Sequence, residues 1–393
     1  MSGVQYLSDR CSLVGDSLLW KFFGLAMATP NVISLSVGEP DFKTPWHISE
    51  EGVYAIEKGK TYYSPTRGQL ELRKGICSYY KRRFGIGGYD ENNVLVTVGA
   101  SEGIDLACRT LLNEGDECIV LDPGYIAYEP SVLLAGGKPV YLKLEESKGF
   151  KVTPEVLESV ITDKTKMIIL NYPSNPTGGI MLREDYEAIE PILKKHHIVA
   201  VADEIYLELT YDQPKCSIGC LTDIKDQLVI LNGFSKAWSM TGWRLGFVMA
   251  DADIITAMNN MHQFTTMGPA TPAQFAAIEA VSEKSDKDIE EHRLSFKGRR
   301  NYLVNQLNRM GLRTVMPQGA FYVFANITPT GLSSYDFCVR LLNEAKVCVI
   351  PGTAFGPSGE GFVRISYAYS LEELKLACGK IQEFLKQFNI PQE

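Results

Sequence analysis

The sequence predicts an α/β protein in which a large, mostly parallel, doubly wound sheet is followed by a smaller α+β domain. The first observation is a regular alternation of segments. Between residues 93 and 250, short strand-like runs alternate with helical patterns at residues 102–112, 125–135 and 183–196. Several runs are apolar nearly throughout, which is typical of strands that helices cover on both faces. This alternation favours a doubly wound sheet. The runs read NVLVTV, ECIVLD, KPVYLKL, KMIILNY, HIVAVAD, QLVILNG and RLGFVMA.

The second observation is a change of character after these runs. A charged helical stretch over residues 272–310 is followed by AFYVFAN, by a helix at residues 334–345, by VCVIPG and GFVRISYA, and by a final helix at residues 371–388. Strands and helices no longer alternate regularly there, so this part is interpreted as a smaller α+β domain.

A chain of 393 residues is longer than one compact core usually supports, so a division into parts is expected. We predict an N-terminal segment, residues 1–45, that packs with the small domain. Residues 46–285 are predicted to form the large ligand-binding α/β domain, and residues 286–393 the small C-terminal α+β domain. The boundary is expected inside the long helical stretch.

The composition argues against several classes of function. The formal net charge is -8 and no long basic block occurs, which argues against nucleic-acid and membrane-surface binding. The start lacks the order of a signal peptide, and no run of about 18 apolar residues is present. Nine scattered cysteines without a C-x-x-C pair indicate reduced thiols. We expect a cytoplasmic protein that acts on small molecules and binds no metal.

Two glycine-containing turns follow predicted strands. In TVGASEG, Gly99 allows a tight turn before a helix expected to begin near Ser101, and free N–H groups at a helix start bind anions. The alternative is an ordinary turn with Ser101 as N-cap. In NYPSNPTGG, Asn175 offers an amide at the carboxyl end of a strand, where open α/β sheets bind ligands. The alternative is a simple turn residue.

Charged residues end two further apolar runs. In VADEIYLEL, Asp203 closes a strand and Tyr206 follows three residues later; the alternative to a ligand site is a helix cap or a structural ion pair. In LNGFSKAWSMTGWRLGF, Lys236 lies in apolar surroundings that lower the pKa of an amine and allow Schiff-base chemistry. Arg244 offers a forked donor for phosphate. The alternative is a snorkelling lysine and a surface arginine.

Together these four strand ends present an anion-binding turn, an amide donor, a carboxylate with a tyrosine, and a lysine with an arginine. Pyridoxal 5′-phosphate carries a phosphate, a ring hydroxyl, a ring nitrogen and an aldehyde, so it would use each of these groups. The convergence therefore predicts this cofactor.

The motifs NPTG, DEIY, GFSKAWSMTGWRLG, LSVGEPDF and VRISYA also occur here in the order of a known family. Over essentially its full length the chain resembles the class I/II pyridoxal-phosphate aminotransferases of fold type I, the aspartate aminotransferase superfamily. The resemblance implies ping-pong transfer of an amino group from an L-amino acid to a 2-oxo acid. Two alternatives stay open: a lyase on the same fold (a carbon–sulfur β-lyase or an amino-acid decarboxylase), and a non-enzymatic aminotransferase-like regulator.

The resemblance assigns the catalytic roles residue by residue. Lys236 would hold the cofactor as a Schiff base and then shuttle a proton at the substrate Cα. Asp203 would pair with the protonated ring nitrogen, and Tyr206 and Asn175 would hydrogen-bond the ring 3′ oxygen. The backbone of Gly99, Ala100 and Ser101, with the side chains of Ser101, Ser235 and Arg244, would hold the phosphate.

The remaining roles concern the ring face, the substrate and a second subunit. Tyr125 would stack on the ring, and Tyr63 would reach the phosphate of a neighbouring subunit, which implies a homodimer. Arg364 would clamp the substrate α-carboxylate with help from Gly38 and Asn175.

Two positions depart from the family pattern. Some members place a serine on the phosphate three residues before the lysine, where this chain has Gly233; Ser235 is the expected substitute. Members that prefer acidic substrates carry a lysine where this chain has Ser101, so Arg10, Lys21 or Arg67 would have to replace it. The segment containing Trp20, Phe22 and Phe23 favours an apolar or aromatic substrate side chain, or simply packs as an amphipathic helix.

Overall fold

The computed structural model describes residues 6–388 and residue 390. Its largest element is a seven-stranded sheet with the strand order β2-β8-β7-β6-β5-β3-β4, in which β8 alone runs antiparallel to its neighbours. The seven predicted strands are confirmed. They are β2 (Val94–Thr97), β3 (Glu117–Asp122), β4 (Lys138–Lys143), β5 (Thr165–Asn171), β6 (Val199–Asp203), β7 (Leu228–Gly233) and β8 (Gly246–Ala250).

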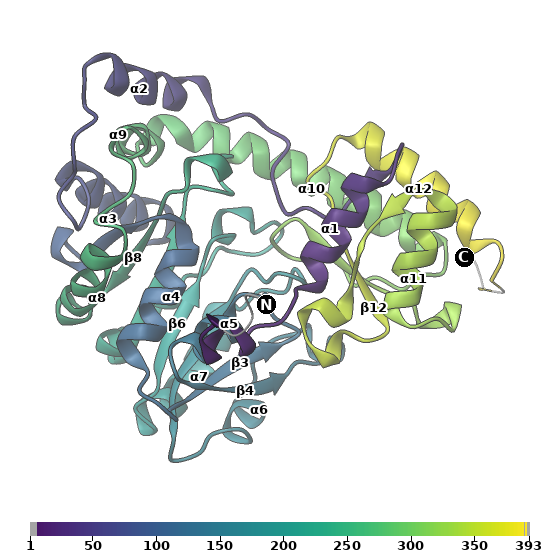
Figure 1. Ribbon diagram of the computed structural model, residues 1–393, viewed down its shortest axis with the longest axis horizontal. Coiled ribbons are helices and arrows are strands. Elements are labelled where there is room, and N and C mark those ends of the chain that lie inside the picture. Colours follow the sequence, from purple (N-terminus) through teal and green to yellow (C-terminus); the bar gives the residue numbers. More distant parts are fainter. Residues whose placement is uncertain (1–5, 389, 391–393) are drawn as a thin grey trace.

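Helices cover both faces of this sheet (Figure 1). Val120 and Ile169 point to the face covered by α4, α5 and α8, while their neighbours Ile119 and Ile168 point to the face that contains α3 and α7. Successive residues of a strand alternate between faces, so a doubly covered strand must be apolar throughout. The helices are α3 (Leu70–Phe84), α4 (Gly99–Leu111), α5 (Tyr128–Leu134), α6 (Pro154–Glu158), α7 (Arg183–Lys195) and α8 (Ala252–Thr265).

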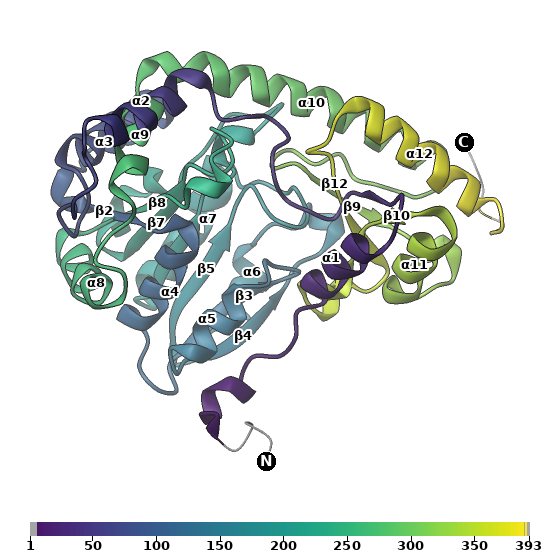
Figure 2. The same cartoon turned by 45° about the horizontal axis from the view of Figure 1, so that its top comes forward.

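The C-terminal part forms a separate three-stranded antiparallel sheet in the order β11-β12-β9. The N-terminal segment joins it, because β1 pairs with β10 and α1 contacts β11. Figure 2 shows α10 running from the helices of the large sheet toward α12. The bounds are α1 (Leu18–Ala28), β1 (Ile33–Ser34), α10 (Asp286–Arg309), β9 (Tyr322–Asn326), α11 (Ser334–Arg340), β10 (Val347–Cys348), β11 (Ile350–Pro351), β12 (Phe362–Ser366) and α12 (Leu371–Leu385).

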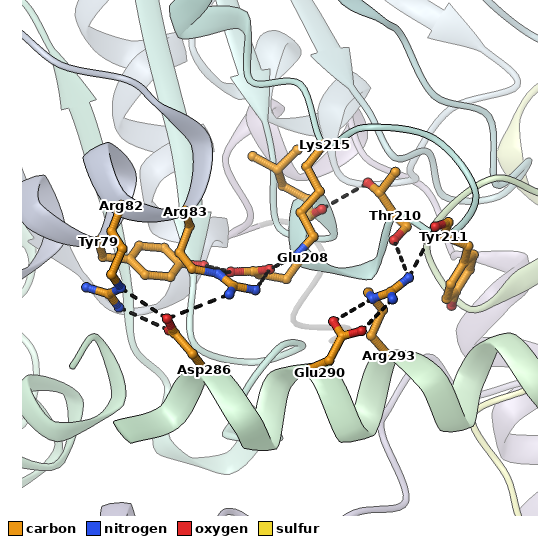
Figure 3. Close-up of polar contacts among 11 residues, drawn as sticks. Tyr79, Arg82, Arg83, Glu208, Thr210, Tyr211, Lys215, Asp286, Glu290 and Arg293 are labelled. Carbon is orange, nitrogen blue, oxygen red and sulfur yellow. Dashed lines mark hydrogen bonds and ion pairs between the residues drawn. The ribbon is translucent and has the colours of Figure 1, made fainter. Parts of the chain in front are cut away.

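The helical stretch predicted over residues 272–310 is interrupted, which corrects the sequence-based expectation. Helix α9 (Thr271–Ala280) ends before Ser282, whose backbone is extended (φ −72°, ψ 162°), and α10 begins at Asp286. The Asp286 carboxylate accepts hydrogen bonds of 3.1 Å from Nε and Nη2 of Arg82 on α3 (Figure 3). An acidic first turn bound to a neighbouring helix fixes this new start. The domain limits at residues 45 and 285 stay predictions.

Smaller corrections concern helix starts and helices that the sequence did not indicate. Helix α4 begins at Gly99, because the Glu102 side chain accepts the Val98 N–H and caps the turn. Helix α5 begins only at Tyr128, so Tyr125 lies in the turn after β3. Helices α3, α6, α8 and α2 (Trp46–Glu57) were not predicted. Among the described residues, no helix is long and apolar enough to cross a bilayer.

Candidate active site

A cavity of about 410 Å³ opens at the carboxyl ends of the central strands. The predicted site residues that line it come from both sheets, from the N-terminal segment and from the start of α4. They are Gly38, Gly99, Ala100, Ser101, Tyr125, Asn175, Asp203, Tyr206, Ser235, Lys236, Arg244 and Arg364. The fold therefore brings together every predicted site residue except Tyr63.

Lys236 lies just beyond β7, and its ammonium Nζ donates a 2.6 Å hydrogen bond to the Gly38 carbonyl oxygen. Burial lowers the pKa of Lys236 to about 8, and the nearby Arg364 and Arg244 charges act in the same direction against Glu39. A lowered pKa gives the amine a larger neutral, nucleophilic fraction near physiological pH than an ordinary lysine has.

Asp203 ends β6 and is almost completely buried. Its carboxylate accepts hydrogen bonds from Tyr128 Oη at 2.9 Å and from the Ile205 N–H at 3.2 Å. Burial raises the pKa of Asp203 to about 6, although both hydrogen bonds and the Lys236 charge oppose this shift. A buried carboxylate of this kind is stabilised when a cationic N–H group binds beside it.

An asparagine forms a hydrogen bond between the carboxyl ends of β5 and β6. Asn171 lies opposite Asp203 in the sheet register and donates through Nδ2 to the Asp203 carbonyl oxygen at 2.9 Å. Its Oδ1 accepts the Asn175 N–H at 2.9 Å, which fixes the NPTG turn. The sheet thus sets the spacing between Asn175 and Asp203.

Arg364 comes from β12 and is 2% exposed. Its Nη1 donates to Asn175 Oδ1 at 2.9 Å and its Nη2 to the Ser36 carbonyl oxygen at 2.5 Å. Nε is buried and has no partner among the described residues. A buried guanidinium with only neutral partners and an open N–H group is suited to a carboxylate ligand.

The opposite end of the cavity is built from glycines and Arg244. Gly99 has φ +73°, and a Cβ placed there would lie 3.1 Å from Arg244 Nη2. A Cβ on Gly246 would lie 2.5 Å from the Ala100 nitrogen, so glycine lets β8 approach the start of α4. The first N–H groups of a helix and an arginine side chain at one point are suited to bind an anion.

The departure at Gly233 has a steric explanation. A Cβ there would lie 3.1 Å from the Leu245 carbonyl oxygen and 3.2 Å from the Gly246 Cα, which is tighter than ordinary packing. Ser235 lines the cavity, whereas Gly233 does not. Ser235 therefore stays the predicted phosphate contact.

Other predicted residues lie away from this cavity. Tyr63 is 86% exposed. Lys21 Nζ donates to Tyr335 Oη at 3.0 Å, Arg67 Nη2 donates to Thr256 Oγ1 at 2.8 Å, and Arg10 lies on the exposed N-terminal turn. None of these three cations lines the cavity.

The aromatic N-terminal segment divides into two roles. Trp20 and Phe23 line the cavity together with Leu19. Phe22 is fully buried and packs edge-on against Tyr335, with ring centroids 5.6 Å apart. The packing alternative thus applies to Phe22, whereas an apolar or aromatic substrate stays a prediction that rests on Trp20 and Phe23.

Sequence reasoning missed several residues that line the cavity. Glu39 stands inside the motif LSVGEPDF, so its place was indicated but not its role. Tyr128 follows Tyr125 by three residues, yet its hydrogen bond links the start of α5 to the end of β6, 75 residues away in the sequence, and leaves no local signal. Tyr322 from β9 bonds Tyr206 through their hydroxyl groups at 2.9 Å.

The chain is similar to known proteins of one family. A family model described as "Aminotransferase class I and II" matches residues 30–381. The chain is 41% identical to aromatic-amino-acid aminotransferase 2 of Thermococcus litoralis over 97% of this chain and 98% of that protein. It is 40% identical to an aspartate aminotransferase of Pyrococcus abyssi, with the same two coverages. The aspartate aminotransferase of Thermus thermophilus solved with maleate superposes with a TM-score of 0.92, at 34% identity, over 98% of this chain and 100% of that one.

Proposed function

Because the chain belongs to the class I and II aminotransferases, we propose that the cavity around Lys236 binds pyridoxal 5′-phosphate and the amino-acid substrate. The chain is a transaminase of fold type I, and its family generally uses this cofactor. Nothing in the comparisons favours a lyase. The observation that carries the assignment is one cavity that holds both a buried lysine of lowered pKa and a buried carboxyl of raised pKa, that of Asp203.

The residues present fit the cofactor. Ala100 and Ser101 at the start of α4, with Ser235 and Arg244, would hold the phosphate. Tyr125 would lie on the ring face, and Asp203 would accept the ring N–H. The cofactor supplies an aldehyde carbon that takes up the amino group and a ring that stabilises negative charge at the substrate Cα.

The chemistry of this chain's own residues follows from their placement. Lys236, as a neutral amine, would act as nucleophile and then move the proton at the substrate Cα. Asp203, which Tyr128 holds by a hydrogen bond, would stabilise the positive charge on the protonated ring nitrogen of the cofactor. Arg364, through its open Nε and its two Nη groups, would orient the substrate α-carboxylate beside Lys236.

The same cavity supports a substrate with an apolar or aromatic side chain. Leu19, Trp20 and Phe23 form an apolar wall, and Glu39 places a negative charge at the cavity. The cations that line it in one protomer are Lys236, Arg244 and Arg364. Each of them already has a partner in this proposal, so none is left for a second substrate carboxylate.

A second copy of the chain would complete the site. Large aromatic side chains are exposed on α2, on the segment that follows it and near the end of α8. Their exposed fractions are 70% for Trp46, 84% for Tyr62, 86% for Tyr63 and 88% for Phe264. Isolated exposed aromatic residues are ordinary, but such a group is typical of an interface. We propose a cytoplasmic homodimer in which Tyr63 reaches the partner's phosphate.

Half-reactions with single L-amino acids test the substrate assignment. Each amino acid is mixed with the holoenzyme without a 2-oxo acid, and the change of the visible cofactor band is followed. We expect L-phenylalanine or L-tyrosine to react with higher kcat/KM than L-aspartate. A preference for L-aspartate would overturn the substrate proposal, and release of ammonia without an acceptor would overturn the transaminase assignment.

A further inference from the structure

Two cysteine side chains meet in the connection between β6 and β7. Cys216 Sγ and Cys220 Sγ are 3.9 Å apart, and both residues are half-buried. Cys108, Cys118, Cys338, Cys348 and Cys378, by contrast, are buried. A short 3-10 turn, Ile218–Cys220, brings the pair together, with Ser217 Oγ accepting the Gly219 N–H at its start.

The surroundings make the two sulfur atoms unequal. The hydrogen bond that the two sulfur atoms share lowers the pKa of Cys220 and raises that of Cys216. The Arg183 guanidinium at the start of α7 lowers the pKa of Cys220 further, although burial opposes this. A thiolate is the nucleophilic form of cysteine, so Cys220 is the sulfur that reacts first with an oxidant.

We propose that Cys216 and Cys220 are a modification site, a thiol pair that hydrogen peroxide converts into a reversible disulfide. The Cys220 thiolate attacks one peroxide oxygen, the O–O bond breaks, and the departing hydroxide takes up a proton as water. The resulting sulfenic acid is attacked by the Cys216 sulfur, the S–O bond breaks and a second water leaves. Two thiols thus give up two electrons, which reduce one peroxide to two waters.

The two sulfur atoms start close to each other. They are 3.9 Å apart, must approach to about 2 Å to form the bond, and belong to one short loop. Between them, Ile218 donates its N–H to Glu204 Oε1 at 2.8 Å, and Glu204 directly follows Asp203. The disulfide would therefore tighten a loop that supports the end of the strand carrying the catalytic carboxylate.

Peptide mass spectrometry of the oxidised holoenzyme tests the proposal. Trypsin releases residues 216–225, CSIGCLTDIK, which holds both cysteines and no other. The protein is treated with hydrogen peroxide and then with a thiol-alkylating reagent. We expect this peptide to be unalkylated and lighter by two hydrogen atoms, and dithiothreitol should restore two thiols that can be alkylated. Exposed Cys11 reports that the oxidant acted, and half-buried Cys77 is the unpaired reference.

Single substitutions test the order of the two steps. Cys216→Ser should trap a sulfenic acid on Cys220 that dimedone labels, whereas Cys220→Ser should leave Cys216 unlabelled under the same conditions. If the peptide keeps both thiols while Cys11 is oxidised, or if dimedone labels Cys216 instead, the proposal is wrong. The wild-type experiment needs no variant, so a folding defect in either substitution does not decide the outcome.

Discussion

Burial moves two pKa values in opposite directions within one cavity: that of Lys236 falls to about 8 and that of Asp203 rises to about 6. Both changes have the same cause, because a low-dielectric site disfavours the charged form of either group. A bound cofactor with a cationic ring nitrogen would reverse the effect on Asp203 alone. The cavity thus contains a nucleophile, Lys236, and a carboxylate, Asp203, that can bind a cationic group.

The apoprotein should therefore react with pyridoxal 5′-phosphate at a rate set by the neutral fraction of Lys236. The neutral amine is the attacking form, so the rate rises with pH and should level off above about pH 8. Stopped-flow absorbance across pH measures this rate, with Nα-acetyl-lysine as the reference for a free ε-amine. A rate that keeps rising toward the ordinary lysine value of 10.5 would contradict the lowered pKa.

At the scale of elements, the approach of β8 to the start of α4 shapes the phosphate end. Gly246→Ala places a Cβ 2.5 Å from the Ala100 nitrogen and should cost about 1–3 kcal/mol, with weaker cofactor binding. Gly242→Ala is the matched control, since nothing lies within 4 Å of its Cβ. Thermal unfolding and cofactor titration measure both effects. Equal behaviour of the two variants would be inconsistent with this packing.

A buried ion cluster holds the segment that follows Tyr206 (Figure 3). Glu208 accepts two 2.8 Å hydrogen bonds from Arg83, one from Tyr79 Oη at 2.8 Å, and one from Lys215. Burial tends to raise the pKa of Glu208, but the Arg83 hydrogen bonds and the Lys215 charge hold it below its ordinary value of 4.5.

Glu208→Gln should destabilise the fold by about 3–5 kcal/mol, because it removes the ionic partner of Lys215 and leaves Arg83 with the longer 3.7 Å ion pair to Asp286. A carboxyl group whose pKa is lowered by folding stabilises the fold at pH values above its pKa in the unfolded chain. This contribution is lost as the pH falls through the lower pKa of the folded state. The difference from wild type should therefore shrink below pH 4.5. Urea unfolding at several pH values measures it, with the exposed pair variant Glu344→Gln as control. A difference independent of pH would contradict the ionic role.

The elements differ in how far the sequence could predict them. The seven strands were predictable because each is apolar on both faces, as Ile168 and Ile169 of β5 illustrate. The break in the helix before Asp286 was not predictable, because the hydrogen bond between Asp286 and Arg82 joins helices about two hundred residues apart in the sequence. The same holds for Tyr128, whose contact with Asp203 arises only when β3 and β6 lie in one sheet.

At the scale of the whole molecule, the cavity exists only when the large sheet, the small sheet and α1 are all in place. Arg364 comes from β12, Lys236 follows β7, and Trp20 belongs to α1. The partner subunit would add the last contact.

Tyr63→Phe should weaken cofactor binding about tenfold or more, because it removes one hydrogen bond to a charged phosphate. Tyr62→Phe, equally exposed in one protomer, is the control. Cofactor titration and sedimentation of the holoenzyme measure binding and assembly. A monomeric, fully active enzyme, or equal affinities in the two variants, would contradict the dimeric site.

Replacement of Lys236 tests the central proposal most directly. The wild-type holoenzyme should show a visible cofactor band that an L-amino acid substrate bleaches, and a 2-oxo acid should restore it. Lys236→Ala should lose both the lysine-linked band and turnover, while Lys21→Ala, outside the cavity, should keep both. A Lys236→Ala protein that transaminates at the wild-type rate would contradict the proposed mechanism.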